Sequence, residues 1–291
     1  LDFSGTTLLN IAAIEGRGGN DTLIGSVGAD TLVGGKGNDR LQGGMGDDLF
    51  LYNDGDGYDR VSGGDGTDTL QGGAADDAIG LVRFSGSDTV EVIDGGAGYN
   101  VIRNNDYSNT LDFSGTTLLN IAAIEGRGGN DTLIGSVGDD VLDGGAGNDR
   151  LVGAAGSDTY RFGRGYGRDT IDDCDAQHAQ SEVYGETEDR VLFGADIVAD
   201  QLWFSRTGDD LLVDVIGTGD RLAVAQWYAG ATNRVDRFTT ADGAYLLDSQ
   251  VEQLVSAMAA FAPPAMGETA LPPVLQDELQ PVIAAAWQSV A

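Results

Sequence analysis

The chain of 291 residues is poor in basic side chains and in long apolar runs. It has 16 Lys and Arg against 47 Asp and Glu, which gives a formal net charge of −31 at pH 7. Nucleic acids and anionic membrane surfaces are bound through basic side chains, so this composition argues against both as partners. The longest apolar stretches, 257–266 and 282–287, are shorter than the roughly 20 residues that a transmembrane helix needs. We therefore expect no nucleic-acid partner and no transmembrane segment.

Cysteine and histidine each occur once, as Cys174 and His178. A lone cysteine excludes an intramolecular disulfide, so an extracellular chain would need another cross-link, and a bound metal ion would serve. The H-E-x-x-H motif of zinc proteases and the G-x-S-x-G elbow of lipases are both absent. Cys174 and His178 lie four residues apart in a polar segment, which favours a solvated loop over a nucleophile pair. We expect no enzyme here, and any active site would precede Leu1, because the chain opens inside a repeat like a piece of a longer protein.

The acidic residues are mostly aspartate, 38 against 9 glutamates, and they accompany 46 glycines. Asp sits well in tight turns and ligates metal ions from a turn, whereas a merely solvating acidic chain would usually mix both residue types. Intrinsic disorder is the alternative for so acidic a chain, but 41% hydrophobic residues and a strict internal period argue against it. We therefore expect a cation to neutralise the aspartates.

Two levels of repetition organise the sequence. Residues 1–28 recur without change at 111–138, an offset of 110 residues. Within each copy runs a nine-residue period with Gly at the first, second or fourth position, Asp at the sixth and a large apolar residue at the eighth. Thirteen units occur, at 16–51, 54–80, 95–103, 126–161 and 164–172. Short periods of this kind indicate a solenoid.

Each unit divides into a turn half and a strand half. Glycine permits the positive φ of a tight turn, Asp closes the turn, and a strand of about three residues follows. Such strands bury too little surface alone, so they must stack on neighbours with the eighth positions inside. The predicted core residues are Leu23, Leu32, Leu41, Phe50, Val61, Leu70, Ile79, Leu133, Leu142, Leu151, Tyr160 and Ile171.

The units GGKGNDRLQ (34–42) and GGAGNDRLV (144–152) are representative of the thirteen nine-residue units. The pattern resembles the RTX (repeats-in-toxin) family, whose G-G-x-G-x-D-x-U-x nonapeptide winds a parallel β-roll around Ca²⁺. The resemblance implies an all-β fold. A parallel β-roll, which is a Ca²⁺-binding β-solenoid, would form two blocks, followed by a small β-rich cap and a short C-terminal helical tail.

Calcium takes about six to eight hard oxygen ligands. In a roll, units n and n+2 stack on one edge, so the carboxylate of one turn can meet the backbone carbonyls of the next turn. Counting such pairs suggests roughly five to ten ions. The predicted metal ligands are Asp21, Asp30, Asp39, Asp48, Asp59, Asp68, Asp77, Asp131, Asp140, Asp149, Asp158 and Asp169. Two turns are weaker candidates, since Asn100 replaces Asp in one unit and Ala75 replaces Gly before Asp77.

Two other interpretations of these turns stay open. The first is a metal-free solenoid with ordinary Asp-Gly turns, in which rows of Asp about 4.8 Å apart would repel one another strongly. The second is an EF-hand that begins at Asp54, although that motif requires Glu at its twelfth position, where Asp65 stands. Stacked calcium sites explain more of the sequence than either.

The chain is expected to divide into four parts. These are a first β-roll block with bridging strands at 1–110, a second block at 111–172, a β-rich cap at 173–247 and a helical tail at 248–291. The tail has no Lys or Arg, which is compatible with the uncleaved C-terminal type I secretion signal of RTX proteins. A packed terminal helix pair is the alternative.

Segments outside the repeats are interpreted as structure rather than as sites. Residues 1–15 and 111–125 are expected to form the same bridging strand and turn before each block, and 81–94 to form strand pieces. The cap is expected to have a small core of Trp203, Phe204, Trp227, Tyr228 and Phe238, and the tail to have helices near 249–261 and 274–287.

The sequence thus predicts a calcium-binding RTX module of a secreted bacterial protein that folds after type I secretion. Cytosolic Ca²⁺ would be too scarce to fold it, whereas ~10⁻³ M Ca²⁺ outside the cell would fill weak sites. The expected partners are calcium ions and the type I secretion apparatus, and the expected location is extracellular, either free or at the cell surface. One alternative is a self-assembling surface protein, such as an S-layer protein or adhesin, because the duplication presents similar surfaces twice. The other is the carrier module of a secreted enzyme.

Overall fold

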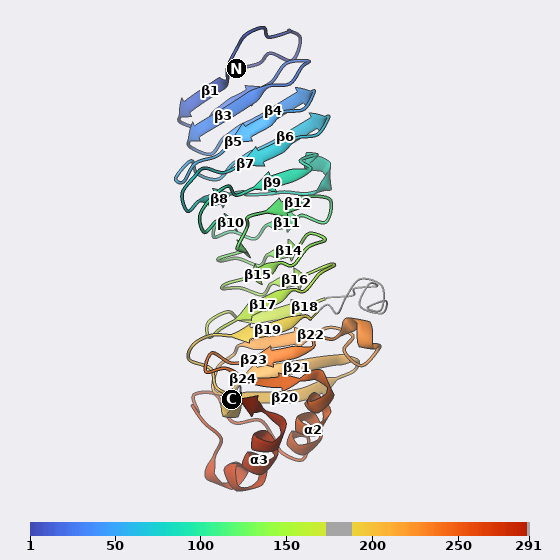
Figure 1. Cartoon of the computed structure of the whole chain (residues 1–291). Helices are drawn as coiled ribbons and strands as arrows, with labels where there is room; N and C mark the ends of the chain where they lie inside the picture. The colour runs from blue at the N-terminus through green and yellow to red at the C-terminus, as the bar shows by residue number, and fades with distance from the viewer. Residues whose placement is uncertain (173–187, 290–291) are drawn as a thin grey trace. The chain divides into compact units, whose positions relative to one another are not determined.

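The computed structural model describes residues 1–172 and 188–289 (Figure 1). Contacts divide it into two compact units, Leu1–Asp140 and Val141–Ala291. The four-part division expected from the sequence stays a prediction. The hypothetical Cys174–His178 pair lies outside the described residues.

The first unit is a parallel β-solenoid whose short strands stack in ladders (Figure 1). One ladder has six strands, β1 (Ile14–Gly18), β3 (Thr31–Lys36), β5 (Leu49–Leu51), β7 (Thr69–Gln71), β9 (Val92–Asp94) and β12 (Thr117–Leu119). A second ladder has β2 (Thr22–Ile24), β4 (Arg40–Met45) and β6 (Arg60–Asp65). Strands that follow one another in the chain therefore belong to alternate ladders.

The nine-residue period explains the register of these ladders. Leu23 pairs with Leu41 and Leu41 with Val61, so units n and n+2 share a face. Leu32 pairs with Phe50 in the same way in the other ladder. All the predicted eighth-position residues are buried, with no more than 2% of any of them exposed. The predicted parallel β-roll and its core are confirmed.

The solenoid widens in the middle of the first unit. Phe50 pairs with Leu70, Leu70 with Ile93 and Ile93 with Leu118, so steps of 20, 23 and 25 residues follow the step of 18 from Leu32 to Phe50. This region contains β8 (Ala78–Gly80), η1 (Gly86–Asp88), β10 (Val101–Arg103), β11 (Thr110–Asp112), β13 (Ala123–Glu125) and β14 (Thr132–Ile134). β8 and β10 belong to nonapeptide units, and the added residues lie between the units. β8, β10 and β13 pair in a further parallel ladder, so the wider rungs have an extra side.

The two copies of the bridging segment adopt partly different structures. Asp2 pairs with Ile24 as Asp112 pairs with Ile134, and residues 14–15 begin β1 where residues 124–125 end β13. Only the second copy forms a further strand, β12. The expectation of the same bridging segment in both copies therefore holds for these pairings and fails at β12. A strand requires a paired neighbour, and the two copies lie beside different rungs.

In the second unit, two parallel ladders run from the last repeats into the cap. The first has β15 (Val141–Asp143), β17 (Thr159–Phe162), β19 (Arg190–Phe193) and β23 (Arg237–Thr239), followed by antiparallel β24 (Ala244–Leu247) and β25 (Gln288–Ser289). The second has β16 (Arg150–Val152), β18 (Arg168–Ile171) and β22 (Arg221–Val224), followed by antiparallel β21 (Asp210–Val215) and β20 (Leu202–Thr207). Short 3-10 turns, η3 (Ala199–Gln201) and η4 (Ala231–Asn233), connect these strands. The antiparallel strands cover the ends of the parallel ladders, which is how the solenoid edge is capped.

The cap has an aromatic core centred on Phe238. Its ring centroid lies 6.4 Å from that of Phe193, 5.8 Å from that of Phe204 and 5.9 Å from that of Trp227. The predicted core residues Trp203, Phe204, Trp227 and Phe238 are buried. Tyr228 differs from the prediction, because it is only half-buried and its ring lies 3.9 Å from the guanidinium carbon of Arg206.

The tail forms two helices, α2 (Asp248–Met258) and α3 (Pro273–Ala286), close to the predicted ranges. Apolar side chains at helical spacing, including Val251, Leu254 and Ile283, are buried within the second unit. Among the described helices, none is both long and apolar enough to cross a lipid bilayer.

Candidate metal centre

The sixth-position aspartates form rows along the edges of the solenoid. The backbone N–H of Asp21 donates to Oδ1 of Asp39 at 2.7 Å, and that of Asp39 donates to Oδ1 of Asp59 at 2.8 Å. The same bond joins Asp30 to Asp48, Asp48 to Asp68 and Asp149 to Asp169, at 2.8, 2.8 and 3.0 Å. The fold thus brings together predicted ligands that are 18 or 20 residues apart in sequence.

In several of these turns the second carboxylate oxygen has no partner. Among the described residues, Oδ2 is buried and accepts no hydrogen bond in Asp21, Asp39, Asp48, Asp68 and Asp169. A buried carboxylate oxygen without a partner costs about 1–3 kcal/mol or more, since it has lost its water. A cation in contact with this oxygen would remove that cost.

Where a unit begins with glycine, the absence of a Cβ atom lets this oxygen approach the backbone closely. A Cβ atom at Gly43 would lie 2.1 Å from Oδ2 of Asp48 and 2.7 Å from the carbonyl oxygen of Gly63, one rung away. A Cβ atom at Gly16 would lie 2.9 Å from Oδ2 of Asp21 and 2.6 Å from the carbonyl oxygen of Gly34. One carboxylate oxygen and one carbonyl oxygen from adjacent rungs therefore lie close together beside the same glycine, and oxygens of these two kinds are the ligands that Ca²⁺ prefers.

Burial makes these carboxylates expensive to ionise without a cation. Burial, together with the negative charges of Asp68 and Asp30, raises the pKa of Asp48 to about 6. Burial chiefly raises the pKa of Asp59 to about 7 and that of Asp169 to about 8. A bound cation favours the ionised form, so cation binding and carboxylate ionisation support each other.

Backbone carbonyls must complete each site. In residues 1–172 and 188–289, no three carboxylate, imidazole or thiol side chains converge on one point. Each turn supplies one or two carboxylates, whereas Ca²⁺ takes about six to eight oxygens. The frequent glycines let a backbone carbonyl of the next rung approach the carboxylate, as the carbonyl of Gly63 does beside Gly43.

Three of the predicted turns have a different hydrogen-bond pattern. In these, Oδ2 is already bonded to the N–H at the second position of the unit. The pairs are Asp30 with Ser26 at 2.5 Å, Asp77 with Gly73 at 2.5 Å and Asp140 with Ser136 at 2.6 Å. Oδ1 of Asp131 accepts the backbone N–H of Asn109 at 2.8 Å and the side-chain amide of Asn104 at 3.0 Å. A Ca²⁺ site at any of these four aspartates would need a set of oxygen ligands that differs from that of the other turns.

The EF-hand interpretation fails on the local structure. Asp65, at the position where that motif needs Glu, ends strand β6 rather than beginning a helix. Asp56 closes a turn, because its Oδ2 accepts the backbone N–H of Asn53 at 2.8 Å. The segment is an ordinary part of the solenoid.

Comparison with known proteins agrees with these features. The model of the RTX calcium-binding nonapeptide repeat matches residues 15–50, 51–79 and 125–160. The chain belongs to the RTX calcium-binding proteins. RTX repeats bind Ca²⁺ at multiple sites, and secretion is typical of the proteins that contain them. The model of the haemolysin-type calcium binding protein related domain matches residues 210–250, within the cap.

One solved structure that this RTX chain resembles is the extracellular lipase LipA from Serratia marcescens. The two chains are 23% identical, with a TM-score of 0.34. The similarity covers 69% of this chain and 37% of the lipase chain. The chain thus corresponds to a little over a third of the length of that lipase.

The acidic rows of this RTX protein extend beyond the predicted ligands. The N–H of Asp158 donates to Oδ1 of Asp189 at 2.8 Å, and the N–H of Asp189 donates to Oδ2 of Asp236 at 2.7 Å. Asp220 accepts the N–H groups of Gly165 and Gly167 at 2.9 and 3.0 Å. The signal in the sequence was the Asp-Arg-apolar triplet at 189–191, 220–222 and 236–238, which repeats the sixth to eighth positions of the unit at 39–41.

In the rung at 95–103, the side-chain amide of Asn100 takes the place of the aspartate carboxylate. Its Oδ1 accepts the N–H of Asp77 at 3.0 Å, as an aspartate would. Its Nδ2 donates to the carbonyl oxygen of Asn120 at 3.2 Å, and both atoms lie close beside Gly95. An N–H donor bonds the carbonyl that a cation would otherwise bind, so we interpret this rung as metal-free.

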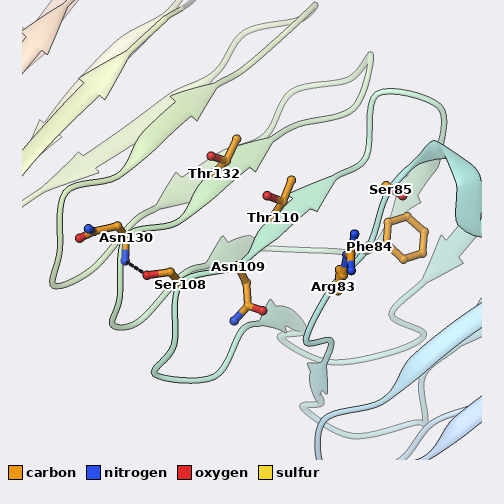
Figure 2. Close-up of a pocket in the computed structure, with 8 residues that line it drawn as sticks. All are labelled: Arg83, Phe84, Ser85, Ser108, Asn109, Thr110, Asn130 and Thr132. Atoms are coloured by element: carbon orange, nitrogen blue, oxygen red, sulfur yellow. Dashed lines mark hydrogen bonds between the residues drawn. The ribbon is translucent and has the colours of Figure 1, made fainter.

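A separate polar hollow of about 590 Å³ lies beside β11 and β14 (Figure 2). Its lining includes Arg83, Ser85, Asn109, Thr110, Asn130 and Thr132. The hydroxyl of Ser108 accepts the backbone N–H of Asn130 at 2.8 Å (Figure 2). Its lining has a guanidinium group and no carboxylate, so it does not suit a Ca²⁺ ion and is distinct from the acidic rows.

Proposed function

We propose that this chain is the calcium-triggered folding module of a secreted protein. The observation that carries the proposal is the set of buried, unpartnered Oδ2 atoms at Asp39, Asp48, Asp68 and their equivalents. The rungs that bury these atoms cannot be stable until a cation supplies the missing partner. Binding and folding then become one equilibrium, as in other small metal-stabilised domains.

The net charge of −31 also makes folding depend on Ca²⁺. Where Ca²⁺ is scarce, repulsion among the aspartates opposes the compact state and keeps the chain extended. Millimolar Ca²⁺ removes the repulsion and completes the turns. A chain with this property stays open during export and folds after it. We therefore propose that the folded module is extracellular.

The burial of the helical tail supports export of the chain before it folds. Leu279, Ile283 and Trp287 are at most 8% exposed in the folded second unit. Trp287 packs against Phe204 of the cap, with ring centroids 6.5 Å apart. An apolar face that is buried in this way is accessible to a secretion apparatus only before the cap folds, so we propose 248–291 as the recognised segment.

In this proposal the module has no catalytic residue of its own. The acidic side chains are committed to turns and to rows of hydrogen bonds, and the activity of the parent protein would come from other segments. The carrier role and the self-assembling surface role differ in what Ca²⁺ does to the oligomeric state. Light scattering of the full-length parent at low and millimolar Ca²⁺ separates them, because a monomer under both conditions contradicts self-assembly.

Circular dichroism of the protein in chelator and in millimolar Ca²⁺ tests the proposed function. We expect a largely unfolded spectrum in chelator and a β spectrum with Ca²⁺. Mg²⁺ should substitute poorly, because it requires a smaller octahedral site with ligands at about 2.0–2.1 Å. A full β spectrum in the chelator would contradict the proposal.

A further inference from the structure

The acidic row in the first unit crosses a break in the repeats. Residues 81–94 contain no nonapeptide unit and carry no predicted ligand. The backbone N–H of Asp68 nevertheless donates to Oε2 of Glu91 at 2.8 Å. This repeats the bond from the N–H of Asp48 to Oδ1 of Asp68, also at 2.8 Å. Glu91 therefore occupies the place of a sixth-position aspartate without belonging to a repeat.

The backbone before Glu91 also imitates a repeat turn. Thr89 has φ 49° and ψ 51°, a left-handed conformation that glycine adopts in the nonapeptides. Its hydroxyl accepts the N–H of Gly64 at 2.7 Å, which holds the two rungs in register. A threonine in this conformation is uncommon, and here the hydrogen bond to the neighbouring rung stabilises it.

These residues lie around Gly63 as the predicted ligands of the preceding rung lie around Gly43. A Cβ atom at Gly63 would lie 2.2 Å from Oδ2 of Asp68 and 2.0 Å from the carbonyl oxygen of Thr89. At Gly43, one rung before, the corresponding neighbours are Oδ2 of Asp48 at 2.1 Å and the carbonyl oxygen of Gly63 at 2.7 Å. The carbonyl of Thr89 thus replaces a glycine carbonyl.

The carboxylate beside Gly63 is fully enclosed. Asp68 is 0% exposed, and its Oδ2 has no hydrogen-bond partner among the described residues. No described ion pair joins Glu91 to an Arg or Lys side chain. Two carboxylates, linked through the backbone hydrogen bond from Asp68 to Glu91, therefore lie together, and no described ion pair offsets the charge of either.

We propose that Asp68, Glu91 and the carbonyl of Thr89 form a Ca²⁺ site that the nonapeptide pattern does not encode. The inference rests on the proposed calcium-binding function and adds one site to it. Glutamate suits the position because its longer side chain brings the carboxylate to the N–H of Asp68 from a backbone that is not a glycine-rich turn. The site joins the rung at 63–71 to the wider rungs that follow.

Counting bound Ca²⁺ by native mass spectrometry of the whole chain tests this site. Glu91→Gln keeps an oxygen that can accept the N–H of Asp68 but removes the charge. Asp65→Asn is the matched control, because Asp65 is an exposed carboxylate in the same rung. We expect Glu91→Gln to bind one Ca²⁺ fewer than the wild-type chain and Asp65→Asn to bind the same number.

Hydrogen exchange in saturating Ca²⁺ separates a local site from a general folding defect. In Glu91→Gln we expect faster exchange confined to residues 63–71 and 86–94, with residues 16–51 unchanged. An unchanged ion count in Glu91→Gln, beside a wild-type chain that binds several ions, overturns this site and leaves the proposed function intact. A loss of protection throughout 16–80 also overturns it, since Glu91 would then support folding in general. A wild-type chain that binds no Ca²⁺ overturns both.

Discussion

The two identical segments, 1–28 and 111–138, have the same local turns and different burial. Asn10 and Asn120 both have positive φ, at 57° and 56°. Ser4 and Ser114 each donate a backbone N–H to the carboxylate two residues before, at 3.0 Å. Yet Leu1 is 63% exposed, whereas its counterpart Leu111 is 0% exposed. Identical residues thus form the same turns but are buried only where rungs surround them.

The difference arises from the neighbouring rungs. Leu111 lies between Phe84, which it meets in an isolated bridge, and Leu133, its partner in β14. The ring of Phe113 stacks on that of Phe84 with centroids 4.9 Å apart. In the first copy, Leu1 accepts a hydrogen bond from Ile24 on one side. Each rung of a solenoid is stabilised mainly by the rungs beside it, so burial depends on position in the stack.

Removal of Ca²⁺ should abolish the difference between the copies. In millimolar Ca²⁺ we expect slow hydrogen exchange in 111–125 and fast exchange in 1–13. In chelator the second copy should lose at least about 10³-fold of its protection, because its rungs unfold. The identical sequences share intrinsic exchange rates and so provide their own control. A Thr7→Ser marker at an exposed position separates the peptides by mass. A difference that persists in chelator would show that burial does not depend on the metal.

Truncation of the same leucine in each copy should have unequal effects. Leu111→Ala removes a fully buried side chain, so we expect it to lower the free energy of unfolding by about 2–5 kcal/mol. Leu1→Ala is the matched control and should change it by less than about 0.5 kcal/mol, since Leu1 is mostly exposed. Urea unfolding in saturating Ca²⁺ measures both. Equal effects would contradict the account of burial by neighbouring rungs.

Asn100→Asp should convert an amide-bonded rung beside the second copy into a metal site. The amide of Asn100 bonds the carbonyl of Asn120, and a carboxylate there would repel that oxygen unless a cation lay between them. We expect one additional Ca²⁺ per chain and a steeper folding transition in a Ca²⁺ titration. Asn10→Asp, an exposed change of the same kind in the first copy, should add none. An unchanged count in Asn100→Asp would show that the oxygens beside Gly95 do not form an ion site.

Protonation of buried carboxylates at acid pH should partly replace Ca²⁺ in stabilising the rungs outside the duplicated segments. Burial raises the pKa of Asp59 to about 7 and that of Asp169 to about 8, above the ordinary value of 3.8. The folded state then holds protons that the unfolded state releases, so the metal-free fold loses stability as pH rises from about 4 through 7 and 8. Metal-free protein should gain β structure in circular dichroism on acidification from about pH 8.5 to 5. Asp59→Asn should reduce this dependence, and a gain of structure at higher pH would contradict it.

Much of the site was predictable because the repeat places the same atoms at the same spacing. The apolar eighth positions and the rows that join Asp21 to Asp39 and Asp30 to Asp48 follow from the period. The assignment of individual ions stays a prediction. The sequence also contained an overlooked signal, the Asp-Arg-apolar triplet, which marks Asp189 and Asp236 in the cap.

Other features could not be predicted from the repeat. Glu91 continues an acidic row from outside any nonapeptide, and only the position of its rung reveals this. Asn100 has an amide that bonds a carbonyl 20 residues further along. The extra side of the wider rungs depends on insertions whose path is set by packing. Each of these depends on a partner that is remote in sequence.

The sequence by itself determined the turns, the parallel β-roll and the acidic character of its edges. These follow from φ and ψ preferences and side-chain alternation among a few adjacent residues. Only the tertiary structure decided which carboxylate oxygens lack partners, which rungs widen and which of two identical segments is buried. Those properties depend on atoms one rung away, at steps of 18 to 25 residues, and the same turn therefore has different surroundings at different places in the stack.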